Sequence, residues 1–201
     1  MERNIDCPCG KNFPVQPMEE IDLDLNPEYI DMICNGSFMS FICPGCGKNH
    51  KPEYPVILMW PSKNLKFEVL PELDRGEFNR RKKENSGFET IISYAELADR
   101  LAVILDGLEP TVIEALKYYL LVKAEETYPD LDISAWYYGK GSEGIEFHLH
   151  GIKAGEVAVM RVPQQLYDKT MEEFHKHPEK EIFSSLRKTT YLSVQNMFSR
   201  L

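Results

Sequence analysis

Four of the five cysteines in this 201-residue chain lie in two short turns that contain proline and glycine. The second turn reads Cys43-Pro44-Gly45-Cys46-Gly47, and its two-residue spacing brings both sulfurs of the pair to one side. The first turn, Cys7-Pro8-Cys9-Gly10, is one residue shorter but keeps the proline and the glycine in register. Two such turns commonly supply four thiolates to one tetrahedral Zn²⁺. We therefore predict one structural Zn²⁺ per chain, held by Cys7, Cys9, Cys43 and Cys46.

The two cysteine pairs are further apart than in the commonest zinc ribbons, where roughly 15 to 20 residues separate them. We expect an inserted strand and helix that return the chain to the site. Two other interpretations of the cysteines are open. They could be small buried side chains, or Cys43 and Cys46 could form a redox dithiol. The redox motif is less favoured, because it usually lies where a strand meets a helix and strands are expected on both sides here.

The fifth cysteine, Cys34, lies in the apolar run Met32-Ile33-Cys34. An apolar neighbourhood of this kind favours a position in the core. Because the first cysteine pair is one residue short, the sequence also leaves open that Cys34 replaces Cys7 or Cys9 as a ligand.

Composition places the chain among globular proteins. Apolar residues make up 43% of it, which is enough to bury a core, and its length allows two small domains. No run approaches the eighteen or so consecutive apolar residues that a membrane helix needs. The amino-terminal residues show no apolar leader with a cleavage site. We therefore expect a cytoplasmic protein with free thiols and no association with a membrane.

The distribution of charge along the chain indicates which class of partner to expect. The net charge is −9, and residues 1–74 hold six basic and twelve acidic side chains, so the half with the cysteines is the more acidic one. Binding to phosphate backbones needs a concentrated basic face, so nucleic acid is not the expected partner. The basic run Arg80 to Lys83 is interpreted as part of a solvated linker, although it could contact an acidic partner or nucleic acid.

Residues 1–74 predict a zinc ribbon that consists mostly of antiparallel strands. Strands are expected at 2–6 and 11–15 around the first cysteine turn, at 20–25, at 38–42 before the second turn, and at 54–60 and 65–70, which form a hairpin. Asn26-Pro27 predicts the start of a helix that ends near Asn35-Gly36.

Residues 75–87 are charged and nearly without apolar side chains, so we expect a linker there and an α+β domain over 88–201. Ser93-Tyr94-Ala95-Glu96 has the spacing of a capping box and predicts a helix that stops near Gly107. Pro110 predicts the start of a second helix that packs against the first. Its apolar stripe comprises Val112, Ile113, Leu116, Tyr119 and Leu120.

Three strands at 133–138, 144–151 and 156–162 are separated by turn residues and predict an antiparallel meander. Helices are expected at 163–176 and 179–186, and no element is predicted after Lys188. The fold class is therefore α+β: an antiparallel β zinc ribbon, then a domain of paired helices, a three-stranded meander and further helices.

The segment from Ile5 to about Glu72 resembles the CpXC domain, a zinc-ribbon-like domain of bacteria and archaea. The resemblance rests on the two cysteine turns, on Glu20-Ile21-Asp22 followed by Asn26-Pro27-Glu28, and on the strand ends Tyr54-Pro55 and Leu70-Pro71-Glu72. It covers about the first third of the chain. It implies a metal site and a fold, and it implies no particular reaction.

Other candidate sites are weaker. Glu146, His148 and His150 alternate with apolar residues and share one face of a predicted strand, where they could bind a metal or move protons. The same alternation arises on the solvent side of any antiparallel sheet, and this second interpretation is preferred. His50 follows the second cysteine turn and could hydrogen-bond a sulfur, but a solvated turn residue is the preferred interpretation.

Four thiolates fill the tetrahedral shell of zinc and leave no position for water or substrate, so the predicted metal is structural. The preferred function is therefore a non-catalytic protein-interaction or scaffold module with another protein as its partner, which the C-terminal domain would contact. Two alternatives belong to other classes. One is a nucleic-acid-associated, transcription-type zinc-ribbon factor, and the other is an enzyme with its site on the Glu146, His148 and His150 face.

Overall fold

The computed structural model describes residues 2–80 and 87–198. The chain divides into two compact units, Met1–Ala98 (unit 1) and Asp99–Leu201 (unit 2). The division falls within helix α3 (Tyr94–Leu105), so each unit includes a part of this helix. Among the described residues, no helix combines the length and the apolar character that crossing a membrane requires.

Unit 1 is built on a four-stranded sheet in the order β3-β6-β7-β8. Its strands are β3 (Glu20–Asp22), β6 (Val56–Trp60), β7 (Leu65–Leu70) and β8 (Glu89–Ile92). The predicted hairpin is confirmed: β6 and β7 are antiparallel and are joined by the short helix η1 (Pro61–Lys63). The expectation of mostly antiparallel strands over residues 1–74 is confirmed, with β3 as the exception, because it runs parallel to β6. Strand β8, which lies beyond residue 74 and was not predicted, runs parallel to β7. Both connections are long and contain helices, which is what parallel neighbours require.

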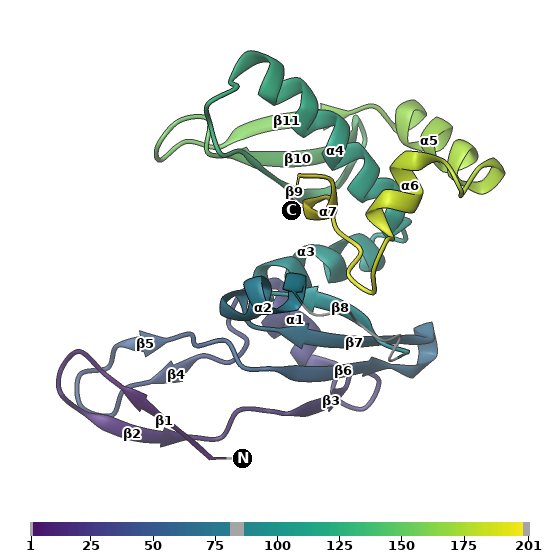
Figure 1. Ribbon diagram of the computed structural model, residues 1–201. Helices are drawn as coiled ribbons and strands as arrows, with labels where there is room; N and C mark the ends of the chain where they lie inside the picture. Colours follow the sequence, from purple (N-terminus) through teal and green to yellow (C-terminus); the bar gives the residue numbers. More distant parts are fainter. Residues whose placement is uncertain (1, 81–86, 199–201) are drawn as a thin grey trace. The chain divides into compact units, whose positions relative to one another are not determined.

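Helices lie on one face of this sheet (Figure 1). They are α1 (Glu28–Cys34), α2 (Arg75–Arg80) and the first part of α3, and a short helix η2 (Glu72–Asp74) precedes α2. Alternate residues of β6 and β7 are buried, as are Ile33 of α1, Phe78 of α2 and Leu97 of α3. The helices and the sheet therefore form the main apolar core of this unit.

The division into units differs from the boundaries expected from the sequence, which were 1–74, a linker 75–87 and 88–201. Residues 75–80 form α2, and β8 adds a strand to the sheet of unit 1, so this unit continues to Ala98. The rest of the basic run, residues 81–83, lies outside the described residues.

The expected capping box at the start of α3 is half formed. Ser93 Oγ accepts a hydrogen bond from the Glu96 N–H group at 3.2 Å. The Glu96 carboxylate does not complete the reciprocal bond, because the Ser93 N–H donates to the Leu70 carbonyl at 2.8 Å and Glu96 pairs with Arg75 at 2.8 Å. The helix is thereby joined to the end of β7 and to α2.

Two small antiparallel ribbons complete unit 1. One consists of β1 (Arg3–Asp6) and β2 (Asn12–Val15), and the other of β4 (Phe41–Ile42) and β5 (Asn49–His50). They lie beside each other, away from the four-stranded sheet (Figure 1). Their shared core is small and contains Ile5, Cys7, Phe13, Val15 and Cys43, with Phe41 and Tyr54 packed against it.

Unit 2 contains the predicted three-stranded meander, in the order β11-β10-β9. The strands are β9 (Ser134–Gly141), β10 (Gly144–His150) and β11 (Ala158–Val162), and both pairings are antiparallel. Helix α4 (Pro110–Thr127) contacts β9, and α5 (Gln164–Lys176) contacts β10. Helix α6 (Glu181–Leu186) packs on α4, and α7 (Gln195–Phe198) lies beyond Lys188, where the sequence predicted no element.

Candidate metal centre

The two cysteine turns lie at the ends of the two ribbons. In the first turn the Cys7 N–H donates to the Lys11 carbonyl and the Gly10 N–H donates to the Cys7 carbonyl, both at 2.8 Å. In the second turn the same pattern joins Cys43 to Lys48 and Gly47 to Cys43, both at 2.9 Å. Gly47 adopts φ = 73°, a conformation that glycine reaches without the steric penalty of other residues. The proline and glycine residues thus produce the turns that the sequence indicated.

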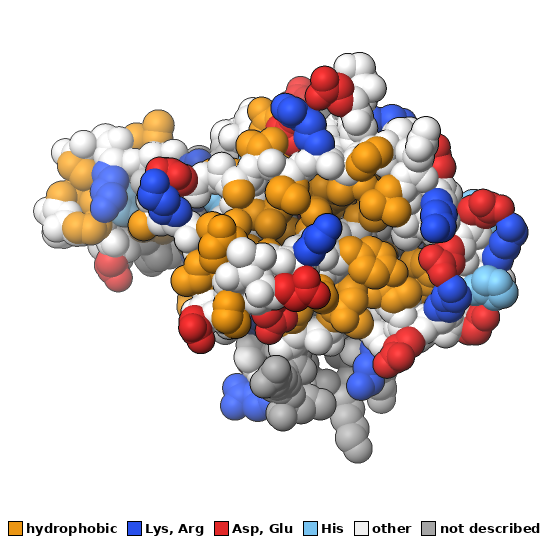
Figure 2. Space-filling view, turned by 90° about the horizontal axis from the view of Figure 1, so that it is seen from above, with side chains coloured by type: hydrophobic (Ala, Val, Ile, Leu, Met, Phe, Trp, Pro, Cys, Tyr) orange, Lys and Arg blue, Asp and Glu red, His pale blue; other side chains and the backbone are white. Residues whose placement is uncertain are grey.

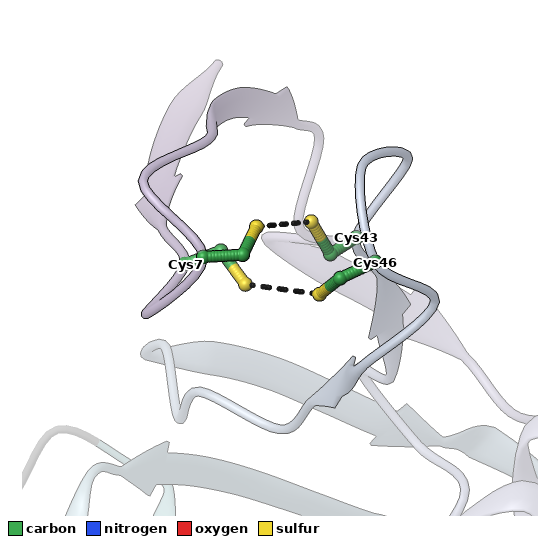
Figure 3. A group of neighbouring side chains, drawn as sticks. Cys7, Cys43 and Cys46 are labelled. Carbon is green, nitrogen blue, oxygen red and sulfur yellow. Dashed lines mark hydrogen bonds between the residues drawn. The ribbon is translucent and has the colours of Figure 1, made fainter.

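The sulfurs of the two turns meet in one group. Cys7 Sγ lies 3.5 Å from Cys46 Sγ, and Cys9 Sγ lies 3.7 Å from Cys43 Sγ. All four sulfurs are within 4.8 Å of one another. Figure 3 shows the side chains of the two turns pointing toward each other. The four predicted ligands are therefore gathered in a cluster that could hold one metal ion.

The four cysteines differ in their surroundings. Cys7 and Cys43 are buried, with exposed fractions of 5% and 1%, whereas Cys9 and Cys46 are exposed. The Gly45 N–H donates to Cys43 Sγ at 3.4 Å, and the His50 Nε2 lies 3.3 Å from Cys7 Sγ. Each buried sulfur therefore has a hydrogen-bonding partner from the protein.

The pKa values of the two buried thiols move in opposite directions. A backbone hydrogen bond from Cys9 lowers the pKa of Cys7, but burial and the neighbouring thiols raise it, to about 12. Burial raises the pKa of Cys43, but the N–H groups of Gly45 and Cys46 lower it, to about 6. Thiolates this close repel one another, so they do not all ionise unless a cation lies between them. Metal binding here would release protons.

Cys34 does not belong to this cluster, and the predicted core position is wrong. It is exposed at the end of α1, whereas the preceding residue, Ile33, is buried. Consecutive helical residues point about 100° apart, so an apolar run of three residues cannot place all of its members in the core of a one-sided helix. Cys34 therefore replaces neither Cys7 nor Cys9 in the group of four sulfurs.

His50 is not the solvated turn residue that we preferred from the sequence. It belongs to β5 and is half-buried, and its ring meets the ring of Phe13 edge-on, with centroids 5.8 Å apart. The pairing of β4 with β5 places His50 opposite Phe41, so the strand pairing fixes its position. The sequence signal for this contact was a histidine four residues after Cys46.

Glu146, His148 and His150 do share the outer face of β10, but they form no metal-binding group of the kind seen at the cysteines. Glu146 accepts a hydrogen bond from His148 and one from Arg161, both at 3.1 Å. The His148 hydrogen bond lowers the pKa of Glu146, and Arg161 contributes to the shift. The ring of His148 stacks on Tyr138, with centroids 3.9 Å apart. Contacts within and between the strands therefore account for the positions of these side chains.

The fold and the site together define a protein whose first unit contains a four-stranded sheet and two β ribbons that gather four cysteines. The chain matches the CpXC protein family over residues 5–117, and it belongs to this family. The matched residues extend beyond the segment 5–72 that carried the resemblance in the sequence, and they include α3 and the first part of α4.

A relative of known sequence spans nearly the whole chain. It is an uncharacterized protein of Treponema pallidum (strain Nichols). The two sequences are 29% identical over an alignment of 214 positions, which covers 96% of this chain and 97% of that protein. No solved structure gives a significant match. The similarity therefore extends over both units.

Proposed function

We propose that the four cysteines bind one Zn²⁺ as thiolates. The observation that carries the proposal is the convergence of the four sulfurs. Zinc–sulfur bonds of about 2.3 Å place the sulfurs of a regular tetrahedron about 3.8 Å apart. The contacts of 3.5 Å and 3.7 Å between the two turns are close to this value, so an ion fits with only small adjustments of the side chains.

The donor set favours zinc. Four soft thiolates select zinc, copper(I) or iron over the hard cations calcium and magnesium. Tetrahedral sulfur sites on paired turns are typical of structural zinc. Four protein ligands fill the coordination shell, so the bound ion would have no open position at which to activate water or substrate.

The proposed role of the ion is to hold the ribbons together. Their shared core has only five buried residues, two of which are themselves cysteines of the cluster. Apolar burial on this scale leaves a small module marginal, whereas structural zinc contributes on the order of 10 kcal/mol in zinc-finger peptides at neutral pH. Zinc removal should therefore unfold the ribbons.

Metal analysis of the purified, reduced protein tests this proposal. We expect one zinc per chain and, after exchange with Co²⁺, the intense visible absorption of a tetrahedral cobalt–thiolate centre. Cys43→Ser should lower the zinc content and the melting temperature, whereas Cys34→Ser is the matched control, because Cys34 is exposed and outside the cluster. A metal-free protein whose stability does not respond to added zinc would refute the proposal. A protein that contains one iron per chain in place of zinc would show that the site binds a different metal.

We further propose that this zinc-stabilised protein is a non-catalytic module that binds another protein. Large apolar side chains on unit 1 are exposed, including Leu25 at 79%, Ile42 at 70% and Leu73 at 95%. In unit 2, Val159 and Met160 are exposed on β11, which is an edge strand of its sheet. Figure 2 shows apolar side chains gathered on one face, with charged side chains around them. Exposed apolar surface and open strand edges are typical of protein-binding sites.

Affinity purification from native lysate tests the interaction. The tagged wild type, Cys43→Ser and Cys34→Ser proteins are compared in lysates with and without nuclease treatment. The retained protein is then made in pure form and its affinity is measured. We expect the same partner with wild type and Cys34→Ser, and a weaker complex with Cys43→Ser. Retention of nucleic acid alone, with a steep dependence on salt, would favour the nucleic-acid-associated alternative instead.

A further inference from the structure

The buried edge of the cysteine cluster needs hydrogen-bond donors. Four thiolates around one Zn²⁺ carry a net charge of about −2, and a charged group that is taken out of water is costly unless it is hydrogen-bonded. Cys9 and Cys46 are exposed, so water can solvate their sulfurs. Cys7 and Cys43 are buried and depend on the protein. The N–H groups of Gly45 and Cys46 both serve Cys43, whereas the backbone serves Cys7 through Cys9, which leaves Cys7 as the sulfur that needs a second donor.

His50 is placed to be that donor. Its Nε2 lies 3.3 Å from Cys7 Sγ, within the range of a hydrogen bond to sulfur. The ring is held on one side by the edge-on contact with Phe13 and through its backbone by the pairing with Phe41. A zinc-bound thiolate can only accept a hydrogen bond, so the ring nitrogen that faces it must carry a proton.

His50 is not a fifth ligand. The group in which all ligand atoms lie within 4.8 Å of one another contains the four cysteines and does not include His50. A residue that contacts a ligand from outside the coordination shell orients this ligand and tunes its basicity.

We propose that His50 donates its Nε2–H to the Cys7 thiolate, and that this bond stabilises bound zinc and shields Cys7 from electrophiles. The inference rests on the proposed zinc site and adds a positioning residue to it. It also divides the four sulfurs into two classes. Cys7 and Cys43 are buried and hydrogen-bonded by the protein, whereas Cys9 and Cys46 are exposed and are the sulfurs that reagents reach first.

Substitutions at His50 separate hydrogen bonding from packing. His50→Phe keeps a ring against Phe13 but has no donor, whereas His50→Gln offers an amide donor without the ring. Asn49→Ala is the matched control, because Asn49 is the exposed neighbour in the same strand. The zinc dissociation constant is measured by competition with a chromophoric chelator. We expect His50→Phe to bind zinc roughly tenfold more weakly, as is common for partners outside the coordination shell. His50→Gln should retain part of the affinity, and Asn49→Ala should match the wild type.

Alkylation of the zinc-loaded protein gives a second test, first on the wild type and then on His50→Phe. N-ethylmaleimide reacts by addition of a thiolate sulfur to its double bond, which forms a carbon–sulfur bond while water supplies a proton to the adjacent carbon and the zinc–sulfur bond breaks. Peptide mass spectrometry then gives the order of labelling. We expect Cys9 and Cys46 to be labelled before Cys7 and Cys43, and Cys7 to be labelled faster in His50→Phe than in the wild type.

The possible results separate the role of His50 from the zinc site on which this role depends. A wild-type protein that binds no zinc refutes the metal site itself. A wild type that binds zinc, together with a His50→Phe protein of unchanged affinity, refutes the role of His50 alone. Labelling of Cys7 as fast as Cys9 in the wild type also contradicts this role. A larger loss of affinity in His50→Gln than in His50→Phe would assign the effect to packing and overturn the proposed hydrogen bond.

Discussion

Replacing Lys117 with methionine would remove the cation that separates two buried carboxylates in unit 2. The Lys117 ammonium lies 2.5 Å from Asp99 Oδ2 and 2.7 Å from Glu114 Oε1, and none of the three side chains is more than 7% exposed. Arg100 is also buried and interacts electrostatically with Glu114, so the group holds two positive and two negative side chains. Methionine keeps most of the volume of the lysine stem and removes its charge.

Backbone groups depend on the same carboxylates. The Tyr137 N–H of β9 donates to Asp99 at 2.6 Å, and the Val194 N–H donates to Glu114 at 2.7 Å. The cluster therefore joins α3, α4, β9 and the segment before α7. Loss of the central cation would weaken all of these connections together, since the carboxylates would repel each other or become protonated.

The expected cost follows from the burial of the cluster. Burial raises the pKa of Asp99 more than Lys117 lowers it, so this carboxylate tolerates its charge poorly even with its partner present. Burial lowers the pKa of Lys117, but Asp99 and Glu114 raise it to about 12. Removing one member of a buried ion pair costs about 3–5 kcal/mol, because the charge that is left has no partner. Against a total stability of about 5–15 kcal/mol for a domain, this is a large loss.

Hydrogen–deuterium exchange measured on peptides from α4, β9 and β10 reports the stability of unit 2 within the full chain. Lys117→Met should increase exchange in these peptides by an amount that corresponds to about 3–5 kcal/mol. The double variant Asp99→Asn/Lys117→Met removes one charge of each sign, so that Glu114 still has Arg100 as its cationic partner. The asparagine also keeps an acceptor for the Tyr137 N–H. The double variant should therefore be more stable than Lys117→Met alone. The reasoning would be refuted if Lys117→Met lowered the free energy of unfolding by less than about 1 kcal/mol. It would also be refuted if the cost of the double variant equalled the sum of the costs of Lys117→Met and Asp99→Asn.

Two further predictions concern the backbone and the pH dependence. Gly144 has φ = 127° and a Cβ there would lie 2.2 Å from the Val162 carbonyl oxygen, so Gly144→Ala should lower the free energy of unfolding by about 3 kcal/mol or more. Gly139→Ala, where a Cβ meets nothing within 4 Å, should be nearly neutral in the same urea titration. Burial raises the pKa of Tyr94 to about 12, so the unfolded chain loses this proton first and stability falls as the pH rises from about 10 to 12. Tyr94→Phe should reduce this decline in urea titrations at about pH 9 and about pH 11, and an unchanged decline would contradict the assignment.

The cysteine cluster could be predicted from the sequence because its determinants are local. Proline and glycine at fixed offsets produce each turn, and cysteine spacing within a turn directs two sulfurs to one side. The contact between His50 and Cys7 depends on the pairing of β5 with β4 and on the packing of Phe13, which join residues far apart in the chain. The position of Cys34 depends on which side of a seven-residue helix faces the core, and three consecutive apolar residues do not determine this side.

The same difference between local and long-range determinants explains which parts of the fold could be predicted from the sequence. The hairpin of β6 and β7 and the meander of unit 2 follow from turn residues between neighbouring strands. The parallel pairings of β3 with β6 and of β7 with β8 join strands that are distant in sequence, and no turn motif indicates them. The stripe on α4 was predicted only in part. Tyr119 is exposed, whereas Glu114 and Lys117 are buried because their charges balance those of Asp99 and Arg100.

The start of α3 holds the chain segment that joins the ribbons to the four-stranded sheet. The Tyr94 hydroxyl accepts a hydrogen bond from the Tyr54 N–H at 2.9 Å and donates to the Tyr54 carbonyl at 2.8 Å. The Glu53 carboxylate accepts from the N–H groups of Tyr94 and Glu72, both at 2.7 Å.

Tyr54 links these bonds to the cysteine cluster, because its side chain packs against the ribbon core that contains Cys7 and Cys43. If the ribbons loosened, the Tyr54 side chain would lose packing, and the backbone of Tyr54 is what hydrogen-bonds the Tyr94 hydroxyl. The match to the CpXC family is consistent with this connection, since it continues through α3 to residue 117. The structural unit that the metal would stabilise is therefore the two ribbons together with the sheet and the first turn of α3.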